Sequence, residues 1–200
     1  MDATLALLAL AVALALRPWR CWGREGPCMP WLATAAALPV LWALGAAGPL
    51  VQPLSGAALL VLLAGWPFAV LAPAAVALGL WMLGEQSGAL ALQRWVWAGL
   101  LPATLMLALG APVRRWLPRH LLSYVLGRGV AATLLACFGA GFAAVALRRS
   151  PGSDWQELLW AQALVASGEA LLTGLAVGVL ALCRPQCLAT YSARLYALPR

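Results

Sequence analysis

The sequence predicts an all-α protein: a polytopic bundle of about seven helices that cross a membrane. Hydrophobic residues make up 64% of the 200 residues and charged residues only 10%. The mean hydropathy is +0.89, more than a water-soluble globule of this size can bury. The apolar stretches are continuous Ala, Leu and Val runs, unlike the alternating ten-residue segments of a membrane β-barrel. No long polar segment interrupts them, so we expect one integral membrane domain over residues 1–200.

The expected spans follow the apolar runs in order. These runs are residues 3–16, 31–47, 54–66, 68–83, 95–110, 121–147 and 158–183. The first is short enough for a signal peptide, but Asp2 replaces the usual basic head and no cleavage site precedes Arg17, so we expect a span. Only Trp66 and Pro67 divide the third run from the fourth, and one kinked helix is the alternative.

Arginine placement indicates the orientation, since all 13 basic residues are arginine. Seven spans with the N-terminus outside put nine arginines on the cytoplasmic side and three outside, whereas six spans divide them evenly. These counts leave out Arg128, which lies within a run. Cytoplasmic loops carry the basic excess, so we expect an outside N-terminus and a cytoplasmic C-terminus. The pI of 9.9 then reflects arginines that face anionic lipid, and nucleic-acid binding is not expected.

The last run carries the candidate site. Glu169 is a lone carboxylate in an apolar stretch, where a charge costs at least about 2.5 to 3.5 kcal/mol unless it is compensated. Gln162, Glu169 and Thr173 are seven and four residues apart, which places them on one helix face. Arg128 is the expected partner of Glu169. This polar stripe is either a hydrogen-bond network that joins helices or a site for substrate binding or conformational coupling.

Other residues are assigned structural roles. Ser167, Gly174 and Gly178 form a separate small-residue face of the last run, suited to close helix packing. His120, the only histidine, is expected at the cytoplasmic edge of a helix, without companions that would make it a metal ligand. The five cysteines are expected to be free thiols, and Cys137 to be a packing residue.

Four segments carry a family resemblance. They are residues 54–67 (LSGAALL through GWP), 117–124 (LPRHLLSY), 168–174 (GEALLTG) and 184–191 (RPQCLATY) with Arg194 and Tyr196. With these segments the chain resembles the substrate-capture permeases of energy-coupling-factor transporters, a divergent bacterial branch of the cobalt/nickel type. The resemblance implies a multi-pass subunit of the bacterial inner membrane that binds a solute on the outer side. Its implied partners are a transmembrane coupling protein and two cytoplasmic ATPases.

The resemblance places ATP chemistry in those partners, and no cofactor is expected here. The chain has no GxxxxGK[ST] loop and no lysine, which agrees with this division. Metal-binding members use the N-terminal amine, a histidine at the second position and a loop histidine. Asp2 and Gln52 stand in the corresponding places here. Because nickel and cobalt favour imidazole, we expect a degraded outer site, and its metal is left open.

Three functions follow from these features. The first is a permease subunit for cobalt, nickel or a related solute. The second is a non-transporting membrane scaffold or assembly protein that keeps the permease fold. The third, an intramembrane enzyme, needs a nucleophile with a base or a metal with several ligands. The only histidine is expected far from Ser167 and Glu169, so catalysis is not expected.

Overall fold

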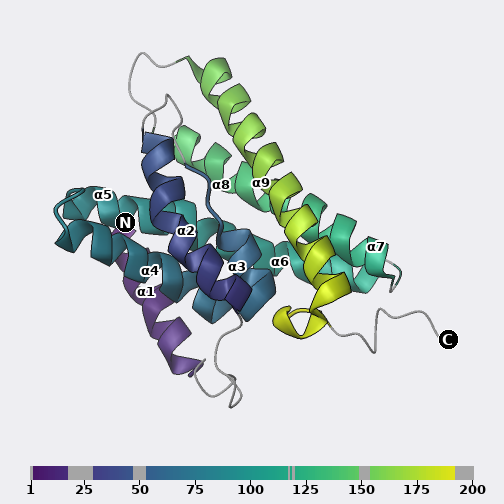
Figure 1. Cartoon of the computed structure of the whole chain (residues 1–200). Helices are drawn as coiled ribbons and strands as arrows, with labels where there is room; N and C mark the ends of the chain where they lie inside the picture. Colours follow the sequence, from purple (N-terminus) through teal and green to yellow (C-terminus); the bar gives the residue numbers. More distant parts are fainter. Residues whose placement is uncertain are drawn as a thin grey trace.

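The structure is a computed structural model that describes residues 2–17, 29–46, 53–116, 118, 120–148 and 154–191. All regular secondary structure in these residues is helical, in seven continuous helices (Figure 1). The first four are α1 (Asp2–Ala15), α2 (Met29–Ala46), α3 (Ala57–Ala64) and α4 (Trp66–Met82). The fifth joins α5 (Gly88–Arg94), η2 (Trp95–Leu100) and α6 (Leu101–Trp116). The sixth joins α7 (Leu121–Tyr124), η3 (Val125–Ala132) and α8 (Thr133–Arg148). The seventh is α9 (Trp155–Cys183), followed by the short turn η4 (Pro185–Cys187). The all-α prediction is confirmed.

Three of the helices are long and apolar enough to cross a membrane: Gly88–Trp116, Leu121–Leu147 and Trp155–Cys183. At 1.5 Å per residue each is about 40 Å long, more than the hydrocarbon core of about 30 Å. Helices α1, α2 and α4 are shorter. With eight residues, α3 is about 12 Å long and covers less than half of that thickness.

The chain breaks between α3 and α4 at Gly65. Its backbone has φ 84° and ψ 170°, a conformation that residues with a side chain rarely adopt. Pro67 then occupies the first turn of α4, where its missing N–H breaks no intrahelical hydrogen bond. The expected division into two helices is therefore confirmed. However, Leu54, Ser55 and Gly56 are not helical, so α3 begins later than expected.

Two wide π-helical segments interrupt the long helices. In the fifth helix, η2 precedes Pro102, whose ring conflicts with the carbonyl four residues earlier and favours a wider turn. In the sixth helix, η3 contains Gly127, Arg128 and Gly129. Arg128 therefore projects from the second π segment.

The sixth helix runs antiparallel between α9 and α6. A Cβ added to Gly129 would lie 3.3 Å from the α-carbon of Gly174 in α9, so the two backbones nearly touch. On its other side, a Cβ added to Gly139 would lie 3.5 Å from Leu105 of α6. The predicted close packing is thus confirmed for Gly174 and for Gly178, which lies near Val125. It is wrong for Ser167, which is exposed and donates to the Ala163 carbonyl within its own helix.

The remaining helices form the other side of the molecule, where α1, α4 and α5 lie opposite α7 and α9 (Figure 1). Helix α2 packs against α3 and α4, and α1 packs against α4 and η2. Trp31 at the start of α2 meets Phe68 at the start of α4 edge to face, with ring centroids 5.8 Å apart. Helix α3 is enclosed by α2, α4, α6 and α9.

Candidate functional site

Glu169 lies in the middle of α9 and is only 4% exposed. Its two carboxylate oxygens accept hydrogen bonds from two consecutive backbone N–H groups. The Ser55 N–H donates to Oε2 at 2.8 Å, and the Gly56 N–H donates to Oε1 at 2.9 Å. Both groups immediately precede α3. The carboxylate of one helix therefore caps the N-terminus of another.

Local geometry explains why α3 starts at this carboxylate. Gly56 has φ 64°, in the left-handed region, which turns its N–H and that of Ser55 toward α9. The Ser55 hydroxyl accepts from the Ala57 N–H at 3.1 Å and satisfies a further donor. On the opposite side, a Cβ on Gly56 would lie 2.8 Å from Leu38 Cδ2, so α2 closes the site. A helix N-terminus carries partial positive charge, and here the chain's own carboxylate neutralises it.

Cys137 of α8 is a third partner of Glu169. Its buried thiol lies beside the carboxylate, which brings α8 to the cap of α3. The sequence reading of Cys137 as a packing residue is incomplete. The contact of Cys137 with Glu169 follows from the antiparallel pairing of the sixth helix with α9, in which Gly141 faces Gln162 and Gly129 faces Gly174. This register brings residue 137 opposite the turn that contains Glu169.

Gln162 and Thr173 are each 3% exposed and lie on the buried face of α9 together with Glu169. The Gln162 side chain lies directly over Gly141 of α8, where no Cβ would fit. Its Oε1 is buried without a hydrogen-bond partner. The three polar residues therefore share one buried face of α9, and the hydrogen bonds of Glu169 go to the two residues that precede α3.

Arg128 does not pair with Glu169. It projects toward α6, where a Cβ on Gly110 would lie 2.8 Å from Nη2. Its Nη1 donates to the Thr190 carbonyl at 3.4 Å, and its Nε is buried without a partner. The expected direct contact is wrong because Arg128 sits on the side of the sixth helix that faces α6, whereas Glu169 faces α3.

The segment after α9 holds the other end of α3. The Ala189 N–H donates to the Leu63 carbonyl at 3.2 Å, and the Thr190 N–H donates to the Leu62 carbonyl at 3.4 Å. These are two of the carbonyls that a helix end leaves without intrahelical partners. The Thr190 hydroxyl shares a hydrogen bond of 2.8 Å with the Tyr124 hydroxyl. Glu169 thus binds the residues at the start of α3, and Arg128 is linked through Thr190 to the end of α3.

The other predicted site residues lie elsewhere. Asp2 is in the first turn of α1, which packs against α4 and η2. Gln52 lies outside the described residues, as do Cys21 and Cys28. His120 is exposed at the start of α7. Within the described part of the chain, no three His, Cys, Asp or Glu side chains gather closely enough to hold a metal ion.

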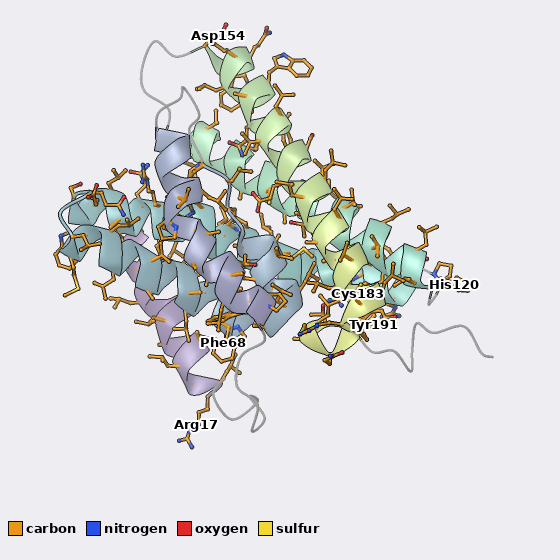
Figure 2. All side chains as sticks on the ribbon, viewed as in Figure 1. Arg17, Phe68, His120, Asp154, Cys183 and Tyr191 are labelled. Atoms are coloured by element: carbon orange, nitrogen blue, oxygen red, sulfur yellow. The ribbon has the colours of Figure 1, made fainter. Side chains whose placement is uncertain are left out.

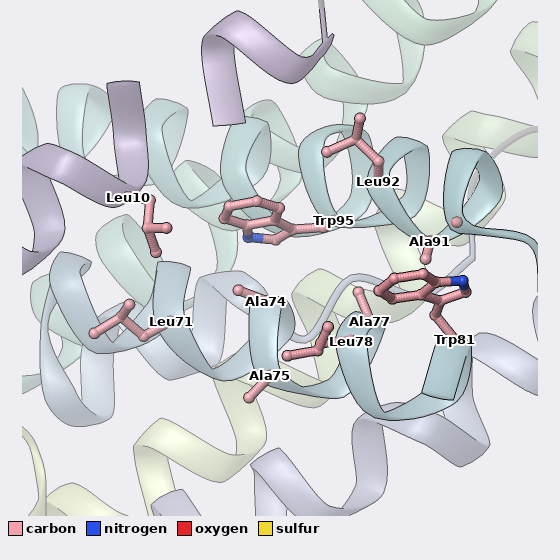
Figure 3. A pocket seen from close by; sticks show the side chains of 11 residues that line it. Leu10, Leu71, Ala74, Ala75, Ala77, Leu78, Trp81, Ala91, Leu92 and Trp95 are labelled. Carbon is pink, nitrogen blue, oxygen red and sulfur yellow. The ribbon is translucent and has the colours of Figure 1, made fainter. Parts of the chain in front are cut away.

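A separate cavity of about 480 Å³ lies among α1, α4, α5 and η2 (Figure 3). Leucine, alanine and tryptophan side chains line it, among them Leu10, Leu71, Trp81 and Trp95. The Trp95 indole N–H donates to the Val70 carbonyl at 3.1 Å, which leaves apolar ring surface toward the cavity. None of the polar candidate residues lines it, so this cavity is distinct from the site at Glu169.

Comparison with protein-family models, with curated proteins and with solved structures finds no match to this chain.

Proposed function

We propose that the chain is a membrane permease subunit that captures a solute and works with separate transmembrane coupling and ATPase proteins. The solute is a transition-metal cation such as cobalt or nickel, or a related species. The subunit has no cofactor of its own, and ATP is used by the partners. In this proposal it crosses the bacterial inner membrane seven times, from an outside N-terminus to a cytoplasmic C-terminus.

One observation carries the proposal: the four segments of the family resemblance contact one another. Ser55 and Gly56 of the first segment bind Glu169 of the third. Leu62 and Leu63, within the stretch spanned by the first segment, accept from residues of the fourth. Tyr124 of the second segment bonds Thr190 of the fourth. Short segments that match by chance have no reason to gather around one helix.

The short helix α3 also supports the proposed seven crossings. Residues 53–56 are non-helical, and Pro53 and Ser55 are buried. Ser55 meets Glu169 near the middle of α9, while Leu62 and Leu63 meet residues just beyond its end. In the proposed topology, this non-helical approach and the half-helix that follows it would together make the third crossing. Irregular backbone at membrane depth is tolerated where protein buries it, and the burial of Pro53 and Ser55 meets this condition. Discontinuous helices of this kind form substrate sites in many transporters.

Coupling in this proposal passes through α3. A cation that binds the Glu169 carboxylate competes with the Ser55 and Gly56 N–H groups for the same oxygens. Losing these two hydrogen bonds frees the N-terminus of α3. Its C-terminus is tied to Ala189 and Thr190, so the change is transmitted to the end of the bundle that would face the coupling protein. In this proposal the solute binds at the N-terminus of α3, and the partner contact depends on its C-terminus.

Uptake of radiolabelled nickel and cobalt tests the proposal. Cells that express the chain with candidate coupling and ATPase partners are compared with cells that lack the chain. We expect uptake that depends on the chain and is lost in Glu169→Gln. Glu157→Gln is the matched control, because Glu157 is an exposed carboxylate in the first turn of the same helix. Uptake that is the same with and without the chain rejects metal transport.

A non-transporting scaffold is the second candidate. It is favoured by the complete engagement of Glu169, whose oxygens are both occupied by the chain's own N–H groups. The replacement of the family's metal-binding histidines by Asp2 and Gln52 favours it as well. In that case Glu169→Gln reduces folding yield, while cation uptake stays at the background level in every variant. Catalysis remains unexpected.

A further inference from the structure

The helix ends around Arg128 carry positive charge. Arg114 and Arg115 are exposed in the last turn of α6, and Arg184 is exposed directly after α9. These ends meet at Arg128, which lies on Gly110 of α6 and donates to Thr190 in the segment after α9. One end of the bundle therefore gathers four arginines from three helices.

No described acidic residue compensates this charge. Asp154 begins α9 at the opposite end from Cys183 and Tyr191 (Figure 2), and Glu157 lies one turn after it. Asp2 and Glu85 lie in α1 and in the turn between α4 and α5, on the side away from α7. Glu169 is occupied by Ser55, Gly56 and Cys137. The positive charge at this end of the described chain is therefore available to an anion that does not belong to the described residues.

Arg128 is the least satisfied of these arginines. Its one hydrogen bond is 3.4 Å long and goes to a neutral carbonyl, and its Nε is buried without a partner. Arg114 follows Gly110 by four residues, so both lie on the same face of α6, about one helical turn apart. Arg128 rests on Gly110. The two guanidinium groups therefore flank one stretch of the α6 surface.

We propose that Arg128 and Arg114 bind the phosphate of an anionic phospholipid headgroup at this end of the bundle. Guanidinium groups donate paired hydrogen bonds to phosphate oxygens, and basic pockets between membrane helices suit such headgroups. Arg128 lies seven residues into its helix, about 10 Å from the start, within reach of the headgroup region for a long side chain. This site is independent of any transported solute.

Native mass spectrometry of the full chain in a non-ionic detergent tests the site. The probes are phosphatidylglycerol and phosphatidylcholine with the same acyl chains. We expect the chain to bind phosphatidylglycerol about ten-fold more tightly than phosphatidylcholine. Phosphatidylglycerol has a net negative charge that the arginines attract, whereas phosphatidylcholine has no net charge. Arg128→Gln should remove this preference, and Arg114→Gln should reduce it several-fold.

Arg17→Gln is the control, since it removes the same charge at the end of α1, far from Tyr191 and His120 (Figure 2). It should keep the full preference. Arg114 is exposed, so Arg114→Gln decides the outcome even if Arg128→Gln fails to fold. Equal affinity for the two lipids, or an unchanged preference in Arg114→Gln, overturns the site. Inorganic phosphate is added as a separate probe. If it raises the thermal stability of the delipidated chain as much as phosphatidylglycerol does, the site binds free phosphate and the lipid assignment is wrong.

Discussion

At the scale of single residues, the environment of Glu169 combines a high desolvation cost with nearly complete compensation. An unpaired carboxylate in the middle of a membrane-spanning helix would be strongly unfavourable. Two backbone N–H groups supply hydrogen bonds instead of a salt bridge, and the Cys137 thiol lies beside the carboxylate. Because the donors begin a helix, the carboxylate also interacts with the partial positive charge of α3. The residue is therefore a connection between α9 and α3 that needs no cation from the chain.

Replacing Glu169 with Gln should lower the thermal stability of the detergent-solubilised protein. The amide keeps one acceptor oxygen but turns an NH₂ group toward a backbone N–H, which leaves a donor unpaired. Hydrogen bonds to charged groups are worth about 1.5 to 3 kcal/mol, and a loss of this order is expected. Thermal unfolding followed by fluorescence-detected size exclusion provides the measurement. Glu157→Gln should stay within about 0.5 kcal/mol of the parent, as exposed positions usually do. Equal stability of the two variants contradicts the cap.

At the scale of helices, close backbone contact holds α9 to the sixth helix. Gly129 and Gly174 face each other, and Gly141 leaves space for Gln162. In a membrane, where lipid is as apolar as the helix surface, such contacts favour association through van der Waals packing. The π-helical segment η3 lies at this contact and contains Arg128, whose side chain projects toward α6.

Gly174→Ala should destabilise the protein by about 1 to 3 kcal/mol, because its new Cβ would overlap Val130. Gly168→Ala is the control within the same helix. A Cβ there meets no atom within 4 Å, and alanine favours helix by up to about 1 kcal/mol. The two midpoints of thermal unfolding should move in opposite directions. A shift of the same sign and size in both variants would show that the contact with η3 does not limit stability.

At the scale of the whole molecule, sequence patterns predicted the helices better than their connections. Each of the seven apolar runs became a helix, because continuous apolar stretches leave few alternatives to helical hydrogen bonding. The polar stripe of Gln162, Glu169 and Thr173 followed from helical periodicity, and all three are buried. The partners Ser55, Gly56 and Cys137 were missed. Their contacts depend on a left-handed glycine and on the register of α8 against α9, which periodicity along one helix does not specify.

The proposed seven crossings predict that the two ends of the chain lie on opposite faces of the membrane. Reporter tags at the N-terminus and at the C-terminus, with one active only outside and one active only in the cytoplasm, measure this directly. The N-terminal tag should report the exterior and the C-terminal tag the cytoplasm. Two tags on the same face would mean that residues 53–64 return to the side from which they came. A tag in the turn at Glu85 locates the end of α4 in the same assay.

The cap of α3 also has a consequence for biosynthesis. The N–H group of Ser55 and the carboxylate of Glu169 are separated by 114 positions along the chain. When α3 leaves the ribosome, Glu169, which accepts hydrogen bonds from the N–H groups at the start of α3, has not yet been translated. Until the last helix is inserted, those N–H groups must be held by water or by the insertion machinery. Nascent chains halted before residue 169 should therefore keep the segment around Ser55 open to proteases, and those halted after α9 has emerged should protect it.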